Sequence, residues 1–170
     1  MYKRQARSGS SVGVSRVDDW ADLEQAIALA RKHDTKVLVE AAVRGREVDI
    51  AVLERPDGTL DVGPALEIHH SAAFFDFDAK YTPGAAEFVI PADLDQAWRD
   101  RLEDAARRVF TALGCAGLLR ADFFLTEHGV VLNEVNTMPG LTELSQFPQI
   151  WRAAGVPYPQ LLDRLLSTAR

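Results

Sequence analysis

The chain lacks several features that would assign it to a special class of protein. Its single cysteine, Cys115, rules out a disulfide within the chain and fits a reducing cytoplasm. No stretch of about 20 consecutive apolar residues is present, so the sequence predicts no membrane-spanning helix. The 19 basic residues are dispersed among 25 acidic residues, without the basic stripe that is typical of nucleic-acid binding. We therefore expect a cytoplasmic protein without nucleic-acid or membrane partners.

The composition that remains is that of one globular domain. Of the 170 residues, 47% are hydrophobic and 26% are charged, which is enough apolar surface for a core. The opening residues Met-Tyr-Lys-Arg-Gln do not fit the pattern of the segment that follows. We interpret residues 1–5 as a non-native segment and residues 6–170 as the domain.

Periodic patterns predict an α+β domain with a mainly antiparallel sheet flanked by helices. Apolar residues at helical spacing predict helices over residues 18–32, 93–113 and 159–168. Short apolar or alternating runs predict strands over residues 36–43, 47–54, 60–68, 117–125 and 130–135. Residues 69–86 show no periodicity, and a loop of this length is typical of a lid that closes over a site.

The last two predicted strands carry the residues with the clearest chemistry. If residues 127–129 form the turn between them, Asp122 lies opposite Glu134 and Arg120 lies opposite Asn136 on one face of the sheet. Facing carboxylates repel each other unless a cation lies between them. Carboxylate and carboxamide oxygens suit Mg²⁺ or Mn²⁺ and not zinc. The pattern predicts a metal site, and the alternative is a set of solvated polar residues on an exposed face.

Other candidates are weaker on local grounds. The turn Gly9–Gly13 could cradle a phosphate with its backbone amides, although it is neither a P-loop nor a dinucleotide-binding turn. Glu40 or Glu47 could accept ribose hydroxyls, and Lys80 in the predicted lid could neutralise phosphate charge. For each, an ordinary surface role is at least as common, and the sequence alone leaves both open.

Four motifs then occur in order along the chain. They are RSGSSVGV at 7–14, FFDFDAKY at 74–81, GLLRAD at 117–122 and NEVNTMPGLT at 133–142. Together they resemble the successive motifs of the D-alanine–D-alanine ligases, a family of ATP-grasp enzymes. The resemblance runs from about Ala6 to the C-terminus and implies an ATP-grasp fold.

The resemblance implies a role for each matching polar residue of the hairpin. Asp122, Glu134 and Asn136 match the ligands of two magnesium ions that bridge the phosphates of ATP, with Mn²⁺ as an alternative. Arg120 and the backbone N–H of Gly140 match the groups that hold the oxygen of the tetrahedral intermediate.

The remaining matches concern the nucleotide and the substrates. The residues that match contacts to ATP, from the γ-phosphate through the ribose to adenine, are Lys80, Glu47, Glu40, Val43 and Phe74. Ser10 and Tyr81 match a hydrogen-bonded pair that links the lid to the substrate site, and Ser145 matches the residue that receives the carboxylate of the second D-alanine. A tyrosine at position 81 also accompanies D-alanine, not D-lactate, as the second substrate.

The implied reaction joins two D-alanines through an acyl phosphate, at the expense of ATP, to supply peptidoglycan precursors. The N-terminal domain of the family is expected to be missing from this chain, which would leave the chain inactive alone. The full-length enzyme would be a homodimer. Two alternatives stay open: a D-alanine–D-lactate or other ATP-grasp carboxylate–amine ligase, and a nucleotide-binding domain without catalysis.

The chain also departs from the family pattern. Lys3-Arg4-Gln5 stands where the family has Val-Lys-Pro, which displaces a phosphate-binding lysine by one position and fits a non-native start. Gln146 replaces the usual aliphatic residue after the serine at 145. Such changes would alter affinity without changing the class of reaction.

Overall fold

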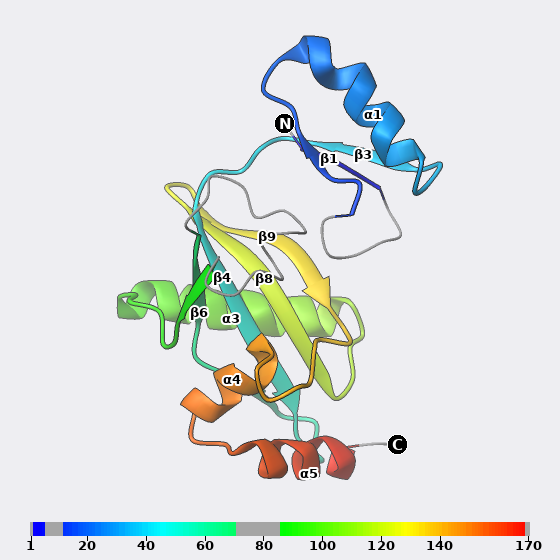
Figure 1. The fold of residues 1–170 in the computed structure, drawn as a ribbon. Coiled ribbons are helices and arrows are strands. Elements are labelled where there is room, and N and C mark those ends of the chain that lie inside the picture. Colours follow the sequence, from blue (N-terminus) through cyan, green and yellow to red (C-terminus); the bar gives the residue numbers. More distant parts are fainter. Residues whose placement is uncertain (1, 6–11, 71–85, 169–170) are drawn as a thin grey trace. The chain divides into compact units, whose positions relative to one another are not determined.

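The computed structural model describes residues 2–5, 12–70 and 86–168 (Figure 1). They belong to two compact units. The first unit comprises residues 1–43 and 70–87, and the second comprises residues 44–69 and 88–170.

The first unit contains a three-stranded antiparallel sheet with the order β2-β1-β3. Its elements are β1 (Tyr2–Gln5), β2 (Ser15–Arg16), the 3₁₀ helix η1 (Trp20–Asp22), α1 (Leu23–Arg31) and β3 (Val37–Glu40). The Asp19 side chain caps η1 by accepting a hydrogen bond from the Ala21 backbone N–H at 2.9 Å. Residues 2–5, which we interpreted as part of a non-native segment, form β1 and pair with both neighbouring strands.

The second unit is built on a sheet with the strand order β7-β6-β4-β8-β9, in which β5 also pairs with β4. Its strands are β4 (Arg46–Glu54), β5 (Leu60–Val62), β6 (Leu66–His70), β7 (Ala86–Val89), β8 (Leu118–Thr126) and β9 (Gly129–Asn136). Its helices are α3 (Gln96–Ala112), α4 (Gln146–Ala153) and α5 (Tyr158–Thr168). The prediction of an α+β fold with a mainly antiparallel sheet is confirmed.

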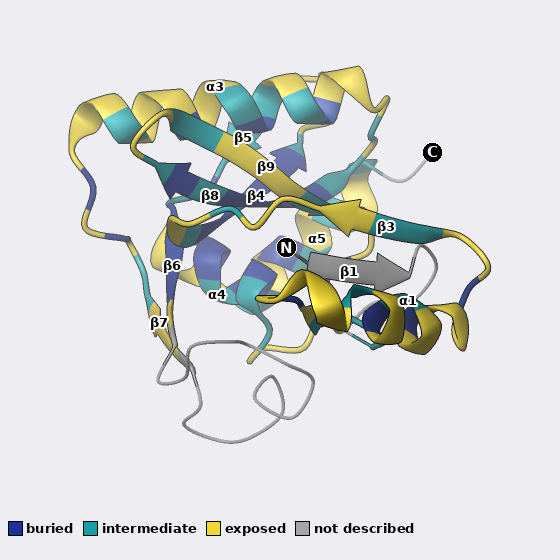
Figure 2. Cartoon of the chain, turned by 90° about the horizontal axis from the view of Figure 1, so that it is seen from above, coloured by how far each residue is buried: buried dark blue, intermediate teal, exposed yellow. Residues whose placement is uncertain are grey.

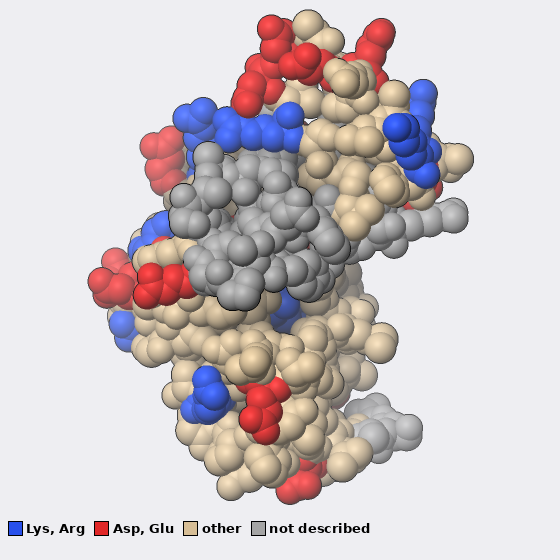
Figure 3. All heavy atoms as spheres, viewed as in Figure 1, with Lys and Arg blue, Asp and Glu red and all other residues tan. Residues whose placement is uncertain are grey.

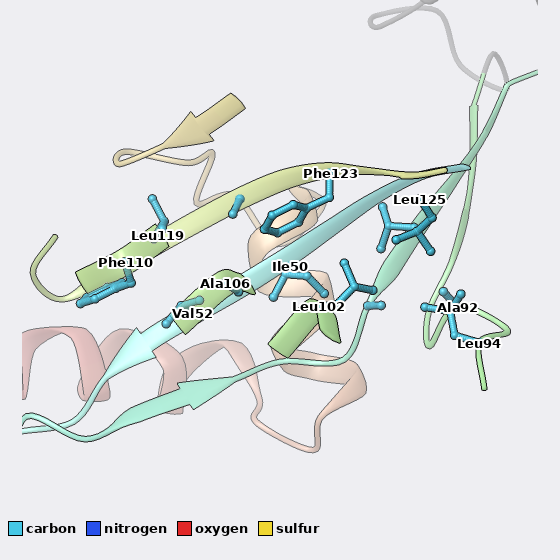
Figure 4. Close-up of a cluster of buried hydrophobic side chains, with 13 residues drawn as sticks. Ile50, Val52, Ala92, Leu94, Leu102, Ala106, Phe110, Leu119, Phe123 and Leu125 are labelled. Atoms are coloured by element: carbon cyan, nitrogen blue, oxygen red, sulfur yellow. The ribbon is translucent and has the colours of Figure 1, made fainter. Parts of the chain in front are cut away.

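Helix α3 covers one face of this sheet and encloses the main core. Asp95 starts the helix by accepting a hydrogen bond from the Trp98 backbone N–H at 2.8 Å. Side chains alternate across the strands, so every second residue of β4 and β8 faces the helix. The core residues labelled on these elements in Figure 4 are Ile50, Val52, Leu102, Ala106, Phe110, Leu119, Phe123 and Leu125.

Helix α4 lies on the opposite side of the sheet from α3 (Figure 2). Phe147 and Ile150 are fully buried there, and the Phe147 and Trp151 rings pack edge to face with centroids 6.3 Å apart. The helix lies very close to the strand connection at Gly63. A Cβ atom at Gly63 would lie 2.5 Å from Cγ2 of Ile150, so only glycine fits beneath the helix.

The predicted secondary structure differs from the structure in several places. The strand predicted over 60–68 is two strands, because the chain breaks at Gly63-Pro64 between β5 and β6. Strands β1, β2 and β7 and helix α4 were not predicted. Helix α4 carries Pro148 within its first turn, where proline is tolerated because the first N–H groups of a helix have no intrahelical acceptor. None of the helices that the structure describes combines the length and the apolar character needed to cross a bilayer.

A partly buried ion pair ties β4 to β6 at the edge of the core. Arg46 donates two hydrogen bonds to the Glu67 carboxylate, at 2.6 and 2.7 Å, and a third to the Asp93 carbonyl at 2.8 Å. The Glu67 side chain is only 8% exposed. The hydrogen bonds from Arg46 lower the pKa of Glu67, although burial opposes this effect. Three segments distant in sequence therefore meet at one guanidinium.

Replacing Glu67 with glutamine should destabilise the second unit at neutral pH by about 1–2 kcal/mol, because the charge-assisted hydrogen bonds from Arg46 become weaker. A carboxylate whose pKa falls on folding adds stability above its unfolded pKa of about 4.3, and this stability is lost as the pH falls through the folded-state pKa. The stabilities of Glu67→Gln and the parent protein should therefore converge in acid. Urea unfolding between pH 3 and 7 would measure this.

The exposed ion pair between Arg55 and Asp61 supplies the matched control. Asp61→Asn should change the free energy of unfolding much less than Glu67→Gln at neutral pH, because solvent screens the exposed pair. A difference between Glu67→Gln and the parent protein that stays constant down to pH 3 would contradict the assignment of the effect to this carboxylate.

Candidate active site

The polar residues predicted from the β8–β9 hairpin do lie on one face of the sheet. Asp122 pairs with Glu134 and Arg120 pairs with Asn136, so the predicted register of these four residues is confirmed. The predicted turn is wrong, because Thr126 pairs with Gly129 across a two-residue turn and not with Val130.

A β-bulge reconciles these two results. Near the turn, Phe123 pairs with Leu132, but the next pair is Asp122 with Glu134, which leaves Asn133 as an extra residue in β9. An extra residue reverses which side chains of a strand face each side of the sheet. Glu134 and Asn136 therefore face the same side as Asp122, away from α3.

Arg120 is the centre of the cluster. It donates two hydrogen bonds to the Asp122 carboxylate, from Nε at 2.7 Å and from Nη2 at 2.8 Å. It donates a third from Nη1 to Oε1 of Gln146, the first residue of α4, at 2.7 Å. Its side chain is 15% exposed. All three nitrogens of the guanidinium are therefore committed within the protein.

A second carboxylate lies beside the same guanidinium. Asp49 of β4 pairs with Asp122 of β8, and its Oδ2 lies 3.6 Å from Nε of Arg120. Asp49 is 1% exposed, and neither of its carboxylate oxygens accepts a hydrogen bond from a described residue. On the other side, Asn136 donates a hydrogen bond from Nδ2 to Oδ2 of Asp122 at 3.1 Å. One cation therefore serves two buried carboxylates.

The pKa values of the cluster reflect this imbalance. Burial raises the pKa of Asp49 well above its ordinary value, and the charge of Asp122 adds to the rise. Burial also raises the pKa of Asp122, because the repulsion from Glu134 adds to it and the hydrogen bonds from Arg120 only partly oppose it. For Arg120, burial lowers the pKa, but the hydrogen bonds and charge of Asp122 outweigh burial and raise it. The cluster favours any additional positive charge.

The loop between β9 and α4 holds two further predicted residues, Gly140 and Ser145. Oγ of Ser145 lies 2.8 Å from Oγ1 of Thr142 and accepts a hydrogen bond from the Thr142 N–H at 3.2 Å. A Cβ atom at Gly140 would lie 2.8 Å from that same Oγ, so the loop is packed tightly against itself. Tyr158 of α5 donates a hydrogen bond to the Leu141 carbonyl at 2.6 Å. The position of Ser145 just before α4 is therefore fixed by contacts with its own loop.

The other predicted residues are distributed over the two units. Glu47 lies on β4, two residues before Asp49 and on the same face of the sheet. Glu40 ends β3 and is exposed, and Val43 follows it in the first unit. The predicted residues that lie outside the described parts of the chain are Ser10, Phe74, Lys80 and Tyr81, together with most of the predicted lid.

Two members of the cluster were missed by the sequence analysis, Asp49 and Gln146. A signal existed for Asp49, because it is a charged residue between Val48 and Ile50, at the start of the apolar part of this strand. No local pattern indicates that Gln146 reaches Arg120, since the contact joins residues 26 positions apart. Within the described residues, no three His, Cys, Asp or Glu side chains are grouped as a metal-binding set. Any cation here would bind through two carboxylates and an amide.

Comparisons with known proteins agree with this geometry. The family model described as "D-ala D-ala ligase C-terminus" matches residues 2–167.

The chain belongs to this family.

The chain is 49% identical to a D-alanine–D-alanine ligase of Mycolicibacterium smegmatis over 99% of its own length and 47% of the relative. It is 47% identical to that of Nocardia farcinica, again over 99% of the chain and 48% of the relative. The chain therefore spans about half the length of the curated relatives it matches.

Solved structures show the same relationship. The VanG D-Ala:D-Ser ligase of Enterococcus faecalis superposes with a TM-score of 0.87 and 40% identity, covering 98% of this chain and 48% of that one. The D-alanine–D-alanine ligase of Bacillus anthracis complexed with ATP superposes with a TM-score of 0.81 and 26% identity, covering 98% and 51%. The expected ATP-grasp ligase fold is thereby confirmed.

Replacing Arg120 with methionine should lower the free energy of unfolding by about 3–5 kcal/mol, because it leaves Asp122 and Asp49 buried without their shared cation. Arg55→Met is the matched control, since the Arg55 side chain is 57% exposed and its loss should be tolerated. Urea unfolding followed by tryptophan fluorescence would compare the two. Equal losses of unfolding free energy in the two variants would show that Asp122 and Asp49 do not depend on the charge of Arg120.

Proposed function

We propose that this chain is the nucleotide-binding C-terminal portion of an ATP-dependent D-alanine–D-alanine ligase. The observation that carries the proposal is the cluster of Arg120, Asp122, Glu134 and Asn136 on one face of the sheet, found in a chain that belongs to this ligase family. The complete enzyme would join two D-alanines through an acyl phosphate for peptidoglycan precursor synthesis, in the cytoplasm, where ATP is available.

The residues present fit a magnesium site. Asp122 and Glu134 are paired across the strands, and the charge of Glu134 raises the pKa of Asp122, so a cation between them would relieve a repulsion. Asn136 donates its Nδ2 to Asp122, which leaves its Oδ1 available as a third oxygen ligand. Mg²⁺ favours one or two carboxylates together with phosphate oxygens. Bound there with ATP, two magnesium ions, or Mn²⁺ in their place, would neutralise phosphate charge during transfer.

The protein's own groups have separate roles in this proposal. Arg120, together with the backbone N–H of Gly140, would stabilise the oxygen on which negative charge develops when the amine attacks the acyl phosphate. Ser145, at the start of α4, would receive the carboxylate of the second amino acid. A helix N-terminus suits an anion because its first N–H groups lack partners within the helix.

The nucleotide contacts are proposed from the family resemblance. Glu47 would contact the ribose of ATP, and the residues on the adenine side would be Glu40, Val43 and Phe74. Lys80 would contact the γ-phosphate. Ser10 and Tyr81 would link the lid to the substrate site. Because the relatives are about twice as long, the pocket for the first D-alanine would lie in an N-terminal domain. From the family resemblance alone, the complete enzyme would be a homodimer.

A second candidate concerns the acceptor. The structural similarity to a D-Ala:D-Ser ligase favours D-serine as an alternative second substrate. Phosphate release by the chain joined to the N-terminal half of a full-length relative, measured with D-alanine, D-serine and D-lactate as acceptors, would separate the two. Release that depends on D-alanine alone would favour the dipeptide ligase, and release that depends on D-serine would favour the alternative.

Glu134→Gln should weaken Mn²⁺ binding in the presence of ATP by at least about tenfold, because it removes the charge of one metal ligand. A tenfold change in affinity corresponds to about 1.4 kcal/mol of binding free energy. The matched control is Glu127→Gln, which makes the same charge change on a turn residue whose side chain is 85% exposed. Electron paramagnetic resonance of free Mn²⁺ measures both. Equal binding by the two variants would refute the metal assignment.

The chain alone should release little phosphate from ATP in the presence of D-alanine, because part of the substrate site is expected in the missing half. A coupled phosphate assay on the 170-residue protein tests this, with a full-length relative as the positive control. Turnover at the rate of the full-length enzyme would show that the fragment is complete for catalysis.

A further inference from the structure

Arg120 has two carboxylates within reach but hydrogen bonds to only one of them. Its Nε donates to Asp122 at 2.7 Å, whereas Oδ2 of Asp49 lies 3.6 Å from the same Nε. Asp122 is also the residue to which the proposed function assigns metal binding. The carboxylate oxygens that accept hydrogen bonds from Arg120 are therefore the same oxygens that would bind the cation.

We propose that Asp49 is a positioning residue that receives the Nε hydrogen bond of Arg120 when Asp122 becomes a cation ligand. This inference rests on the proposed function, since it requires a divalent cation at Asp122. Arg120 would then stay on the same face of the sheet, held by Asp49 and Gln146, with its charge directed at the reacting group.

The geometry allows this exchange with a small movement. A hydrogen bond between nitrogen and oxygen spans about 2.9 Å, so Nε must approach Asp49 by about 0.7 Å. Oε1 of Gln146 accepts a hydrogen bond from Nη1 at 2.7 Å, on a different nitrogen from the one that changes partner. The guanidinium can therefore turn about this contact while Nε, together with Nη2, leaves Asp122. Both Asp49 oxygens are free of hydrogen bonds from described residues and can accept the N–H.

A purely structural role for Asp49 fits these observations poorly. The carboxyl group is 1% exposed, and neither of its oxygens accepts a hydrogen bond from a described residue, although a buried acceptor without a donor costs stability. Its one side-chain hydrogen bond is with Asp122, and because both partners are carboxyl groups it requires a proton on one of them. An apolar side chain would fill the same place between β4 and β8 without the cost of burying a carboxyl group. The position beside Nε of Arg120 gives this carboxyl group a use as an acceptor.

The Nε–H group of Arg120 can be followed directly in the 170-residue protein. Proton–nitrogen NMR spectra resolve arginine Nε–H signals, and the Arg120 signal is assigned by its disappearance in Arg120→Lys. Spectra with ATP and a chelator are compared with spectra containing ATP and Mg²⁺. The Nε–H of Arg46, which donates to Glu67 at 2.6 Å, serves as an internal control outside the cluster.

Two variants separate the acceptor from the charge. Asp49→Ala removes the acceptor, and Asp49→Asn keeps a neutral one with nearly the same shape. Without Mg²⁺, the Arg120 signal should be equally sharp in all three proteins, because Asp122 holds the N–H. With Mg²⁺, it should shift but stay protected from solvent exchange in the parent protein, exchange at least about tenfold faster in Asp49→Ala, and fall between these in Asp49→Asn.

The possible outcomes distinguish this inference from the proposed function. If Mg²⁺ changes the Arg120 signal equally in the parent protein and Asp49→Ala, the exchange of partners is refuted while the metal site stands. If Mn²⁺ binds in a Glu134-dependent manner but Mg²⁺ leaves the Arg120 signal of the parent protein unchanged, the inference is again refuted alone. If no cation binds, both fail. Loss of the Arg120 signal in Asp49→Ala and Asp49→Asn before Mg²⁺ is added would instead assign Asp49 a structural role.

Discussion

Two buried carboxylates, those of Asp49 and Asp122, share the single guanidinium of Arg120, and the second unit is arranged around these three charges. Asp49 and Asp122 come from adjacent strands and face each other, and burial raises the pKa of both carboxyl groups while the charge of Arg120 opposes the rise. Strands β4 and β8 bring them together, the β8–β9 pairing adds Glu134, and α4 adds Gln146 to the far side of the guanidinium. The opposite face of the same strands carries the apolar residues of the main core, which packs on α3. The concentration of charge is therefore local, whereas the described surface residues drawn in Figure 3 show acidic and basic side chains interspersed.

The sequence was sufficient to predict that Asp122 faces Glu134 and Arg120 faces Asn136 across the hairpin, but not how the hairpin achieves this register. Counting from a three-residue turn placed Asp122 opposite Glu134, and the structure reaches the same pair from a two-residue turn followed by a bulge at Asn133. The two departures cancel. Alternation along β8 and the polar residues of β9 signal which residues share a face, whereas the choice of turn and bulge depends on the packing of Leu132 and Val130 toward α3. Sequence patterns therefore indicate which residues share a face, but not which turn and bulge the hairpin adopts.

The contacts that sequence analysis missed are long-range contacts. Gln146 and Arg120 are far apart in sequence, and α4, which carries Gln146, was itself not predicted because its first turn contains proline. Strand β6 and the ion pair between Arg46 and Glu67 similarly depend on a break at Gly63-Pro64 that periodicity alone reads as a continuous strand. Helix α3 shows the opposite case. Its regular apolar stripe and the cap at Asp95 specify it locally, so its position was predicted to within a few residues.

Gly63, which lies beneath α4, affects the position of this helix although it lies outside the cluster around Arg120. Gly63 touches Ile150 in the second turn of the helix, while the first turn of the same helix carries Gln146 and follows Ser145. A helix is stiff over so short a length, so a side chain added at position 63 would push on Ile150 and tilt α4 as a whole. The position of Gln146 relative to Arg120 would change, although neither residue had been altered. The geometry of the cluster around Arg120 therefore depends on the size of residue 63, which lies beneath the helix and outside the cluster.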